Sequence, residues 1–225
     1  MGKTNTTPCC GSDLGAHQEP SRHPRRLPQE GLHPAPILLV AYAFVRLYRS
    51  AVVRRAVFLP RHCRPLQGIV FKDIFPVFQD STAVEALITN FVYHVSSTHT
   101  EKVDVVVGLD ARGFLFGPLI ALRLGAAFVP VRKQGKLPGE TVSTVYAKEY
   151  GEDIFELQKS AIKAGQRAII VDDLIATGGS AKAAGELVRK AGGKTVEYLF
   201  VMELSFLNGA AKLDAPSYSL VKLDD

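Results

Sequence analysis

Residues 169–187 read IIVDDLIATGGSAKAAGEL, and this stretch determines the fold that we expect. Its first three residues form an apolar run typical of a buried strand, and apolar residues at positions 184, 187, 188 and 191 predict a helix over about 179–191. Gly178 and Gly179 allow the backbone to bend and to approach a ligand without a side chain in the way. The stretch therefore predicts a strand, a tight loop and a helix, with Asp172 and Asp173 placed before the loop.

Apolar runs of the same kind recur on both sides of this stretch. They predict strands at 103–109, 126–131, 167–173 and 196–204, with a further helix at 114–125 and a β-hairpin arm after residue 140. Apolar strands that alternate with helices are typical of a parallel sheet covered on both faces. We therefore expect an α/β fold, a parallel twisted sheet flanked by helices, whose ligand lies beyond the carboxyl ends of the strands.

The charge divides the chain into two unlike parts. Residues 1–65 hold 10 Lys and Arg against 3 Asp and Glu, a net of +7, whereas residues 66–225 hold 17 against 19, a net of −2. We interpret 1–65 as an atypical basic N-terminal extension, disordered over 1–36, and 66–225 as one folded domain. Nucleic-acid binding is not indicated for this domain, because it carries no excess of positive charge. All three cysteines precede residue 66, which excludes disulfides and thiolate metal sites from the domain.

The extension contains one apolar run, at residues 35–45. Its 11 residues are too few to span a bilayer, and the run is followed by Arg46, Arg49, Arg54 and Arg55. A basic amphipathic helix, a targeting segment and an extension without a role in the chemistry are the three alternatives. We expect a cytoplasmic protein, with targeting to an organelle as the alternative.

The sequence TGGS at 177–180 is predicted to bind a phosphate group. Amides at the start of a helix have no partner inside the helix, and the helix dipole favours an anion there. The hydroxyls of Thr177 and Ser180 add donors. Neither the Walker pattern nor GxGxxG occurs in the chain.

The two acids before the loop indicate what kind of phosphate compound would bind. Asp172 and Asp173 would repel a free phosphate, but carboxylates accept hydrogen bonds from vicinal hydroxyls such as those of ribose. The pattern therefore favours a sugar phosphate. The alternative is that acids and glycines only end a strand and begin a helix, with no ligand.

IIVDDLIATGGS resembles the phosphoribosyl-diphosphate signature of the type I phosphoribosyltransferases. Four further blocks occur in the family's order and are similar to its adenine-using members: GIVFKDIFPVF (68–78), GLDARGFLFG (108–117), VPVRKQGKLPGE (129–140) and YAKEYG (146–151). The resemblance runs from about residue 66 to the C-terminus. It implies the type I phosphoribosyltransferase fold with a mobile lid loop. It also implies a purine-salvage glycosyltransferase that forms AMP and diphosphate from adenine and 5-phosphoribosyl 1-diphosphate.

The resemblance also implies roles for individual residues. Those for the phosphoribosyl group are Asp172, Asp173, Ala176, Thr177, Gly178, Gly179 and Ser180. Those for the diphosphate and the lid are Arg112, Arg132, Lys133, Lys136 and Tyr150. Val70, Phe71 and Lys72 would contact adenine, with Phe71 stacking on the base. Glu149 and Arg112 would be catalytic, Glu149 by taking or holding a proton of the purine.

Magnesium and a second copy of the chain complete the expected partners. Mg²⁺ would be carried by the oxygens of the diphosphate and ribose rather than by a protein site. The family is usually dimeric, which implies a homodimer. Residues 61–67 depart from the family pattern, and Lys72 stands where the family commonly has Arg.

Two alternatives to this function remain. The enzyme could use hypoxanthine, guanine or xanthine in place of adenine. The domain could instead be a non-catalytic sensor of phosphoribosyl diphosphate, although a sensor needs neither a lid nor a residue in the role of Glu149.

Overall fold

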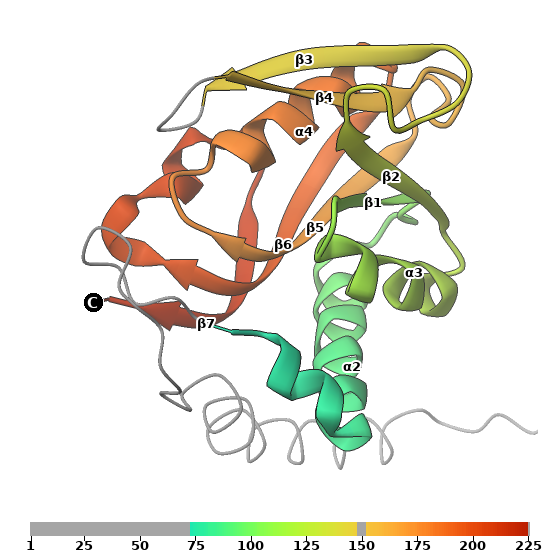
Figure 1. Cartoon of the computed structure of the whole chain (residues 1–225). Helices are drawn as coiled ribbons and strands as arrows, with labels where there is room; N and C mark the ends of the chain where they lie inside the picture. Colours follow the sequence, from blue (N-terminus) through green and yellow to red (C-terminus); the bar gives the residue numbers. More distant parts are fainter. Residues whose placement is uncertain (1–72, 148–151, 225) are drawn as a thin grey trace, which may run out of the picture.

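A seven-stranded sheet, in the order β3-β4-β2-β1-β5-β6-β7, forms the centre of the molecule (Figure 1). The computed structural model describes residues 73–147 and 152–224. The strands are β1 (Val105–Leu109), β2 (Ala127–Lys133), β3 (Thr141–Ala147), β4 (Glu152–Gln158), β5 (Arg167–Ile175), β6 (Lys194–Leu204) and β7 (Ser217–Leu223). The α-helices are α2 (Ser81–Thr98), α3 (Gly113–Leu124) and α4 (Gly179–Lys190), and the 3-10 helices are η1 (Phe75–Gln79), η2 (Ser205–Leu207) and η3 (Gly209–Lys212).

The sheet has a parallel part and an antiparallel part. Strands β2, β1, β5, β6 and β7 run parallel to one another, as the alternation of strands and helices predicted. Strands β3 and β4 form the hairpin arm expected after residue 140, and β4 pairs antiparallel with β2. The sheet is therefore mixed, with the hairpin added at one edge.

The predicted elements are confirmed with shifts of a few residues at their ends. The largest difference that bears on the site is in β5, which continues to Ile175, two residues beyond the predicted end. Leu174 and Ile175 still pair with β6 there, and this pairing outweighs the poor strand propensity of the two acids before them. Helix α2 and strand β7 were not predicted. None of the described helices has the combination of length and hydropathy needed to cross a membrane.

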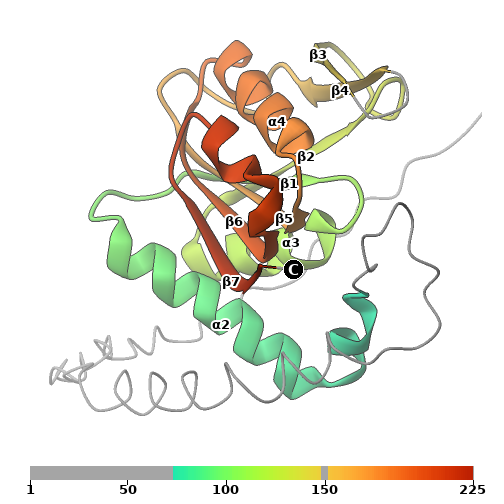
Figure 2. The same cartoon turned by 90° about the vertical axis from the view of Figure 1, so that its left-hand side faces the viewer.

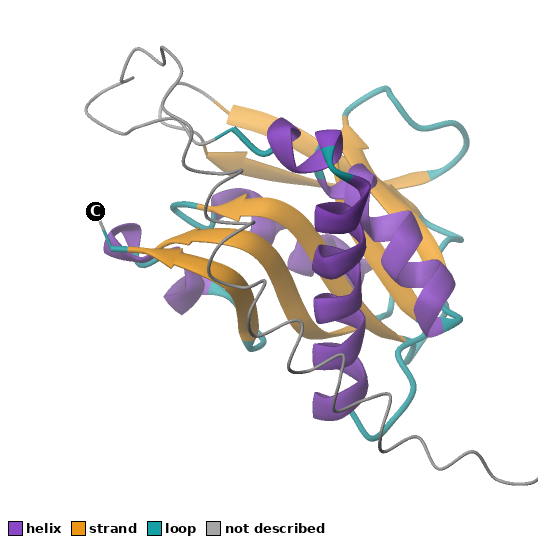
Figure 3. Ribbon diagram, turned by 90° about the horizontal axis from the view of Figure 1, so that it is seen from below, coloured by secondary structure: helices purple, strands orange, loops and turns teal. Residues whose placement is uncertain are grey.

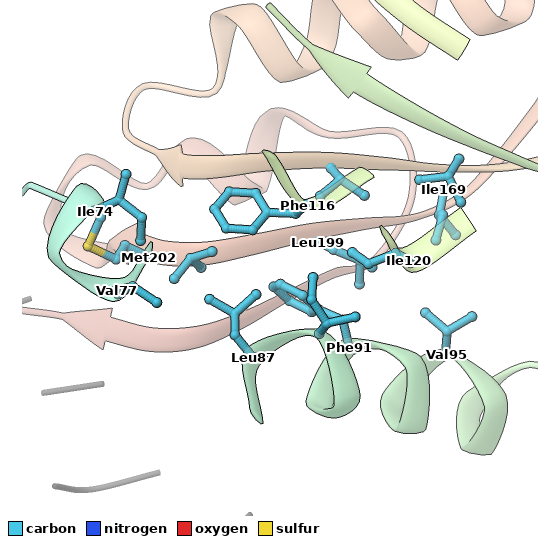
Figure 4. Packing of buried hydrophobic residues seen from close by; sticks show 14 of the residues in the cluster. Ile74, Val77, Leu87, Phe91, Val95, Phe116, Ile120, Ile169, Leu199 and Met202 are labelled. Carbon is cyan, nitrogen blue, oxygen red and sulfur yellow. The ribbon is translucent and has the colours of Figure 1, made fainter. Parts of the chain in front are cut away.

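Helices cover both faces of the sheet (Figures 2 and 3). Alternate residues of β5 separate the two layers, because successive side chains of a strand point to opposite faces. Ile169 packs in one cluster with Phe91 of α2 and Phe116 of α3 (Figure 4). Val171 belongs to the same cluster, whereas Ile170 packs in the cluster that contains the apolar stripe of α4. The central strands are thus buried on both sides, which explains their unbroken β-branched character.

The hairpin arm is attached to α4 by side-chain hydrogen bonds. The Thr144 hydroxyl donates to Glu186 Oε2 over 2.9 Å, and Lys190 Nζ donates to the Ser143 carbonyl over 2.7 Å. Beneath α4, the buried Tyr198 hydroxyl of β6 donates to Asp214 Oδ1 over 2.6 Å. A Cβ on Gly185 of α4 would overlap this hydroxyl oxygen, so glycine at that position allows the helix to lie close to the sheet.

A buried carboxylate fastens α2 to the sheet near the amino ends of the strands. Glu197 of β6 has a side chain only 4% exposed, and its two oxygens lie 2.7 Å from His94 Nε2 and 2.9 Å from His99 Nε2. The His94 ring also stacks on Tyr218 of β7. These contacts link α2 to β6 and β7 near the amino ends of the strands, whereas the predicted site lies at their carboxyl ends.

Candidate active site

The two predicted acids lie near the carboxyl end of β5, at the centre of the parallel sheet. Asp173 is buried, with its side chain 3% exposed, and Asp172 is half-buried. The backbone amide of Asp173 donates to Asp172 Oδ1 over 2.9 Å, which fixes one carboxyl relative to the other. Because both residues belong to a paired strand, their carboxyls are held by the sheet rather than by a loop.

Arg112 reaches the acid pair from the loop after β1. Its Nε lies 3.1 Å from Asp173 Oδ2, within ion-pair distance but without the angle of a hydrogen bond, so that this buried oxygen has no hydrogen-bond partner in the described structure. Gly113 allows this approach, because a Cβ there would overlap the Val171 carbonyl oxygen of β5. The tight contact between the α3 start and β5 therefore brings Arg112 beside the acids.

Burial shifts the pKa of both acids in the same direction. Loss of solvent raises the pKa of Asp172 well above its ordinary value, and the nearby charge of Asp173 raises it further. Burial also raises the pKa of Asp173, while the Arg112 guanidinium acts in the opposite direction. The two carboxyls are thus poorly solvated, which favours the neutral form more than in an aspartate exposed to water.

The TGGS loop connects the end of β5 to the start of α4. Gly178 has φ +80°, a conformation that favours glycine, and it caps the helix without a side-chain hydrogen bond. The first backbone bond of the helix runs from the Lys182 amide to the Gly178 carbonyl over 2.9 Å. The amides of Gly179 and Ser180 precede this bond, so they have no acceptor within the helix and suit an anion.

The two acids, the TGGS loop and Arg112 line one pocket of about 170 Å³. Its lining consists of Arg112 and the unbroken run 172–181. All seven residues predicted for the phosphoribosyl group are in that run: Asp172, Asp173, Ala176, Thr177, Gly178, Gly179 and Ser180. The pocket combines carboxylate acceptors at one side with free amides and a helix N-terminus at the other.

The other predicted cations lie around β2 and do not line this pocket. Arg132 Nε forms an ion pair with Asp110 Oδ2 over 3.0 Å, beside the loop that carries Arg112. Lys133 Nζ lies 3.3 Å from Asp153 Oδ2 on β4. Lys136 is exposed in the connection between β2 and β3, and its carbonyl accepts from Arg132 over 3.2 Å. The side chains of Arg132 and Lys133 are therefore paired within the protein, whereas Lys136 contributes only its backbone carbonyl to these contacts.

Five predicted site residues lie outside the described residues. They are Val70, Phe71, Lys72, Glu149 and Tyr150.

Sequence reasoning did not identify Asp110, Gly209 and Lys212 as neighbours of the site. Lys212 Nζ donates to the Thr177 carbonyl over 2.9 Å, and a Cβ on Gly209 would overlap the Ala176 carbonyl oxygen. No sequence signal marks Lys212, because the contact joins residues 35 positions apart. Asp110 lies in the GLDARG block, but its pairing with Arg132 depends on the register of β1 and β2.

Residues 78–224 match the family described as phosphoribosyl transferase domain. An adenine phosphoribosyltransferase of Yarrowia lipolytica is 59% identical over 158 residues, which are 70% of this chain and 87% of that protein. Adenine phosphoribosyltransferase 1 of Saccharomyces cerevisiae is 55% identical, over 70% of this chain and 84% of that protein.

A solved structure shares the fold. It is an adenine phosphoribosyltransferase of Saccharomyces cerevisiae complexed with D-2,5-dideoxy-2,5-imino-altritol 1,6-bisphosphate and adenine. It superposes with a TM-score of 0.70 at 51% identity and covers 76% of this chain and 99% of its own.

Proposed function

This chain belongs to the phosphoribosyl transferase domain family, and we propose that it forms AMP and diphosphate from adenine and 5-phosphoribosyl 1-diphosphate. The single observation that carries the proposal is the shared pocket, in which the acids of β5, the start of α4 and Arg112 face one space. The relatives that match this chain over most of their length are named for the same activity. The protein would thus be a pentosyl-transferring enzyme of purine salvage.

The donor's ribose 5-phosphate end fits the two sides of the pocket. The ribose hydroxyls would donate to Asp172 and Asp173, whose oxygens are poorly hydrated. The 5-phosphate would accept from the amides of Gly179 and Ser180, aided by the helix dipole and the hydroxyl of Thr177. Ala176 and Gly178 would shape the loop around that phosphate.

The reaction breaks the bond between ribose C1 and the diphosphate and forms a bond between C1 and N9 of adenine. Negative charge develops on the departing diphosphate, and Arg112 is in the lining of the donor pocket. Arg132 and Lys133 would exchange their present acidic partners for diphosphate oxygens, and the exposed Lys136 would join them. Fixed cations in a site that excludes water lower the barrier by stabilising such charge.

Mg²⁺ would bind together with the donor. It is a hard cation that prefers oxygen ligands, and it would neutralise part of the diphosphate's charge. The pocket lining offers carboxyl oxygens from Asp172 and Asp173. Asp172 and Asp173 would hold the ribose hydroxyls in place while the ion supplied positive charge to the donor.

The base site and the lid rest on residues outside the described ranges. Phe71 would stack on adenine, with Val70 and Lys72 beside it. Glu149 would take or hold the proton that adenine loses at N9, and Tyr150 would join the lid over the diphosphate. The connection between β2 and β3 would close over the donor and exclude water.

Assembly, domain division and location complete the proposal. Leu119 and Leu122 are 42% and 79% exposed on the same face of α3, and this apolar surface supports a homodimer. The catalytic domain would comprise residues 66–225, with the basic extension at 1–65. The reaction would take place in the cytoplasm.

An assay of AMP formation with the purified full-length protein tests the function. Labelled adenine, hypoxanthine, guanine and xanthine are each supplied with phosphoribosyl diphosphate and Mg²⁺, and nucleotide products are separated by chromatography. We expect AMP to be the main product. The double variant Asp172→Asn, Asp173→Asn should lose nearly all donor use, because both ribose acceptors are weakened.

The remaining outcomes support the alternatives. A preference for another base would indicate a different purine transferase on the same donor site. Calorimetric binding of phosphoribosyl diphosphate without turnover of any base would indicate a sensor. AMP formation at the wild-type rate by the double aspartate variant would contradict the ribose role of the acids.

A further inference from the structure

We propose that Lys212 is a positioning residue for donor binding, which holds the phosphate loop open by its bond to the Thr177 carbonyl. This inference rests on the proposed function and assigns a role to η3, a segment outside the pocket lining. The Lys212 ammonium donates to the Thr177 carbonyl oxygen over 2.9 Å. Lys212 itself does not line the pocket, whereas Thr177 does. The bond therefore directs this carbonyl to a group behind the loop.

The direction of the Thr177 carbonyl matters because the loop is expected to bind an anion. In a trans peptide the carbonyl and the following amide point in opposite directions, so the bond fixes the whole plane between Thr177 and Gly178. A carbonyl oxygen that turned into the pocket would repel a phosphate and remove an amide from it. Lys212 opposes this rotation and also places a positive charge beside the loop.

A glycine pair supports the same loop from behind. A Cβ on Gly178 would overlap the Gly209 carbonyl oxygen, and a Cβ on Gly209 would overlap the Ala176 carbonyl oxygen. The two backbone segments are thus in direct contact with no side chain between them. Because η3 begins at Gly209 and ends at Lys212, the same short segment supplies the floor of the loop and the cation that fixes its carbonyl.

The chain offers a matched control for the lysine. Lys190 is also exposed, and it donates to a backbone carbonyl, that of Ser143, over 2.7 Å. It lies at the last position of α4, at the far end of the helix from the phosphate loop. Lys190→Met therefore removes the same kind of bond without touching the loop.

Lys212→Met in the full-length enzyme tests the proposal. We expect the KM for phosphoribosyl diphosphate to rise roughly fivefold to tenfold, because an ammonium-to-carbonyl bond at an exposed site is lost. The value of kcat and the KM for adenine should stay within about twofold of wild type, since neither depends directly on the loop. Lys212→Arg should recover most of the donor affinity, and Lys190→Met should match wild type.

Calorimetry with ribose 5-phosphate provides a readout that needs no turnover. Its Kd should rise by about the same factor in Lys212→Met, because the loop and not the base is affected. An inactive wild-type protein would contradict the proposed function. The titration would still test the role of Lys212, because it measures binding and needs no turnover. Equal Kd values for Lys212→Met and Lys190→Met, or a loss of kcat with unchanged donor KM, would overturn the positioning role.

Gly209→Ala probes the floor of the loop. We expect a rise of the donor KM larger than that in Lys212→Met, because the added methyl overlaps backbone that is part of the loop. Gly193→Ala is the control, since its Cβ would crowd the Ile162 side chain beyond the end of α4. The two variants should lose thermal stability, but only Gly209→Ala should weaken ribose 5-phosphate binding. An unchanged Kd in a folded Gly209→Ala protein would contradict the supporting role of η3.

Discussion

The guanidinium of Arg112 lies 3.1 Å from Asp173 Oδ2, so that the cation expected to meet the diphosphate is beside an acid expected to meet the ribose. Arg112 comes from the loop between β1 and α3 and Asp173 from strand β5, and the two groups meet at the centre of the sheet. In the free protein each offsets part of the other's charge. Donor binding would place the diphosphate beside Arg112 and ribose hydroxyls beside Asp173. Each side chain would then have a partner in the donor and would rely less on the other to offset its charge.

Substitution of Arg112 should mainly affect the chemical step. We expect Arg112→Met to reduce kcat/KM by about 100-fold or more, as found when one preorganised charge-stabilising group is removed. Arg112→Lys should lie between this variant and wild type, because it keeps the charge but not the planar fork. Steady-state kinetics with both substrates varied would measure these effects.

Arg123 provides the control for Arg112. It also belongs to the α3 region, where it forms an ion pair with Glu85 of α2, away from the pocket. Arg123→Met should leave kcat/KM within about twofold of wild type, because the pair is exposed and remote. A similar loss in Arg112→Met and Arg123→Met would show that the Arg112 effect is not specific to the site.

The acid pair should cost stability at neutral pH. The folded pKa of Asp172 is raised above its ordinary value of 3.8, so the folded chain retains a proton that the unfolded chain releases above that value. By linkage, stability then falls as the pH rises from about 4 towards the folded pKa. Asp172→Asn removes this term, so its Tm relative to wild type should increase with pH over that window.

Thermal melts of Asp172→Asn and wild type between pH 4 and 8 would check the sign. At pH 7.5 the variant should be the more stable protein, although its donor KM rises strongly. A Tm difference that is independent of pH, or a less stable variant at pH 7.5, would contradict the burial of this carboxyl as an unfavourable charge.

The contact between α4 and β6 can be tested by a double-mutant cycle. Gly185→Ala should reduce the free energy of unfolding by about 2 kcal/mol, because the methyl would overlap the Tyr198 hydroxyl. Tyr198→Phe should cost about 1 kcal/mol through loss of its bond to Asp214. The double variant should lose less than the sum, since the hydroxyl that obstructs the methyl is absent. Urea unfolding would measure all four proteins, and additive losses would rule out the close contact.

The outer face of α3 should control assembly. We expect Leu122→Glu to shift the protein from dimer to monomer, because a charge would replace an apolar side chain that is 79% exposed in the single chain. Light scattering coupled to gel filtration would report the mass. Val145→Glu on β3 is the matched control, since Val145 is also apolar and 54% exposed, and it should not alter the mass.

The acid pair and the phosphate loop were predictable because one contiguous stretch contains the strand, the acids, the glycines and the helix. The placement of Arg112 beside them followed from a general property of parallel sheets, whose strands end at a common edge. The end of β5 was not predictable in the same way. Aspartate is poorly suited to strands, and only the pairing of Leu174 with Met202 of β6 shows that the strand continues beyond the acids.

The contacts that support the site from outside the pocket could not be predicted from the sequence, for a different reason. The bond between Lys212 and Thr177 depends on how the segment after β6 folds back, and neither residue type is unusual in its local sequence. Helix α2, in contrast, carries an adequate signal. Its buried residues include Leu87, Phe91 and Val95 at steps of four, and the side chain of Asp80 caps its start.

Strand β5 keeps its register with β6 from Ile169 to Ile175, through both acids. An insertion or deletion of one residue within this run would turn every later side chain to the opposite face of the sheet, and would exchange Asp172 for a neighbour. The segment from 169 to 180 should therefore tolerate no change in length. Length variation among related chains, or in engineered insertions, should fall instead in the connections at the amino ends of the strands, where the donor does not bind.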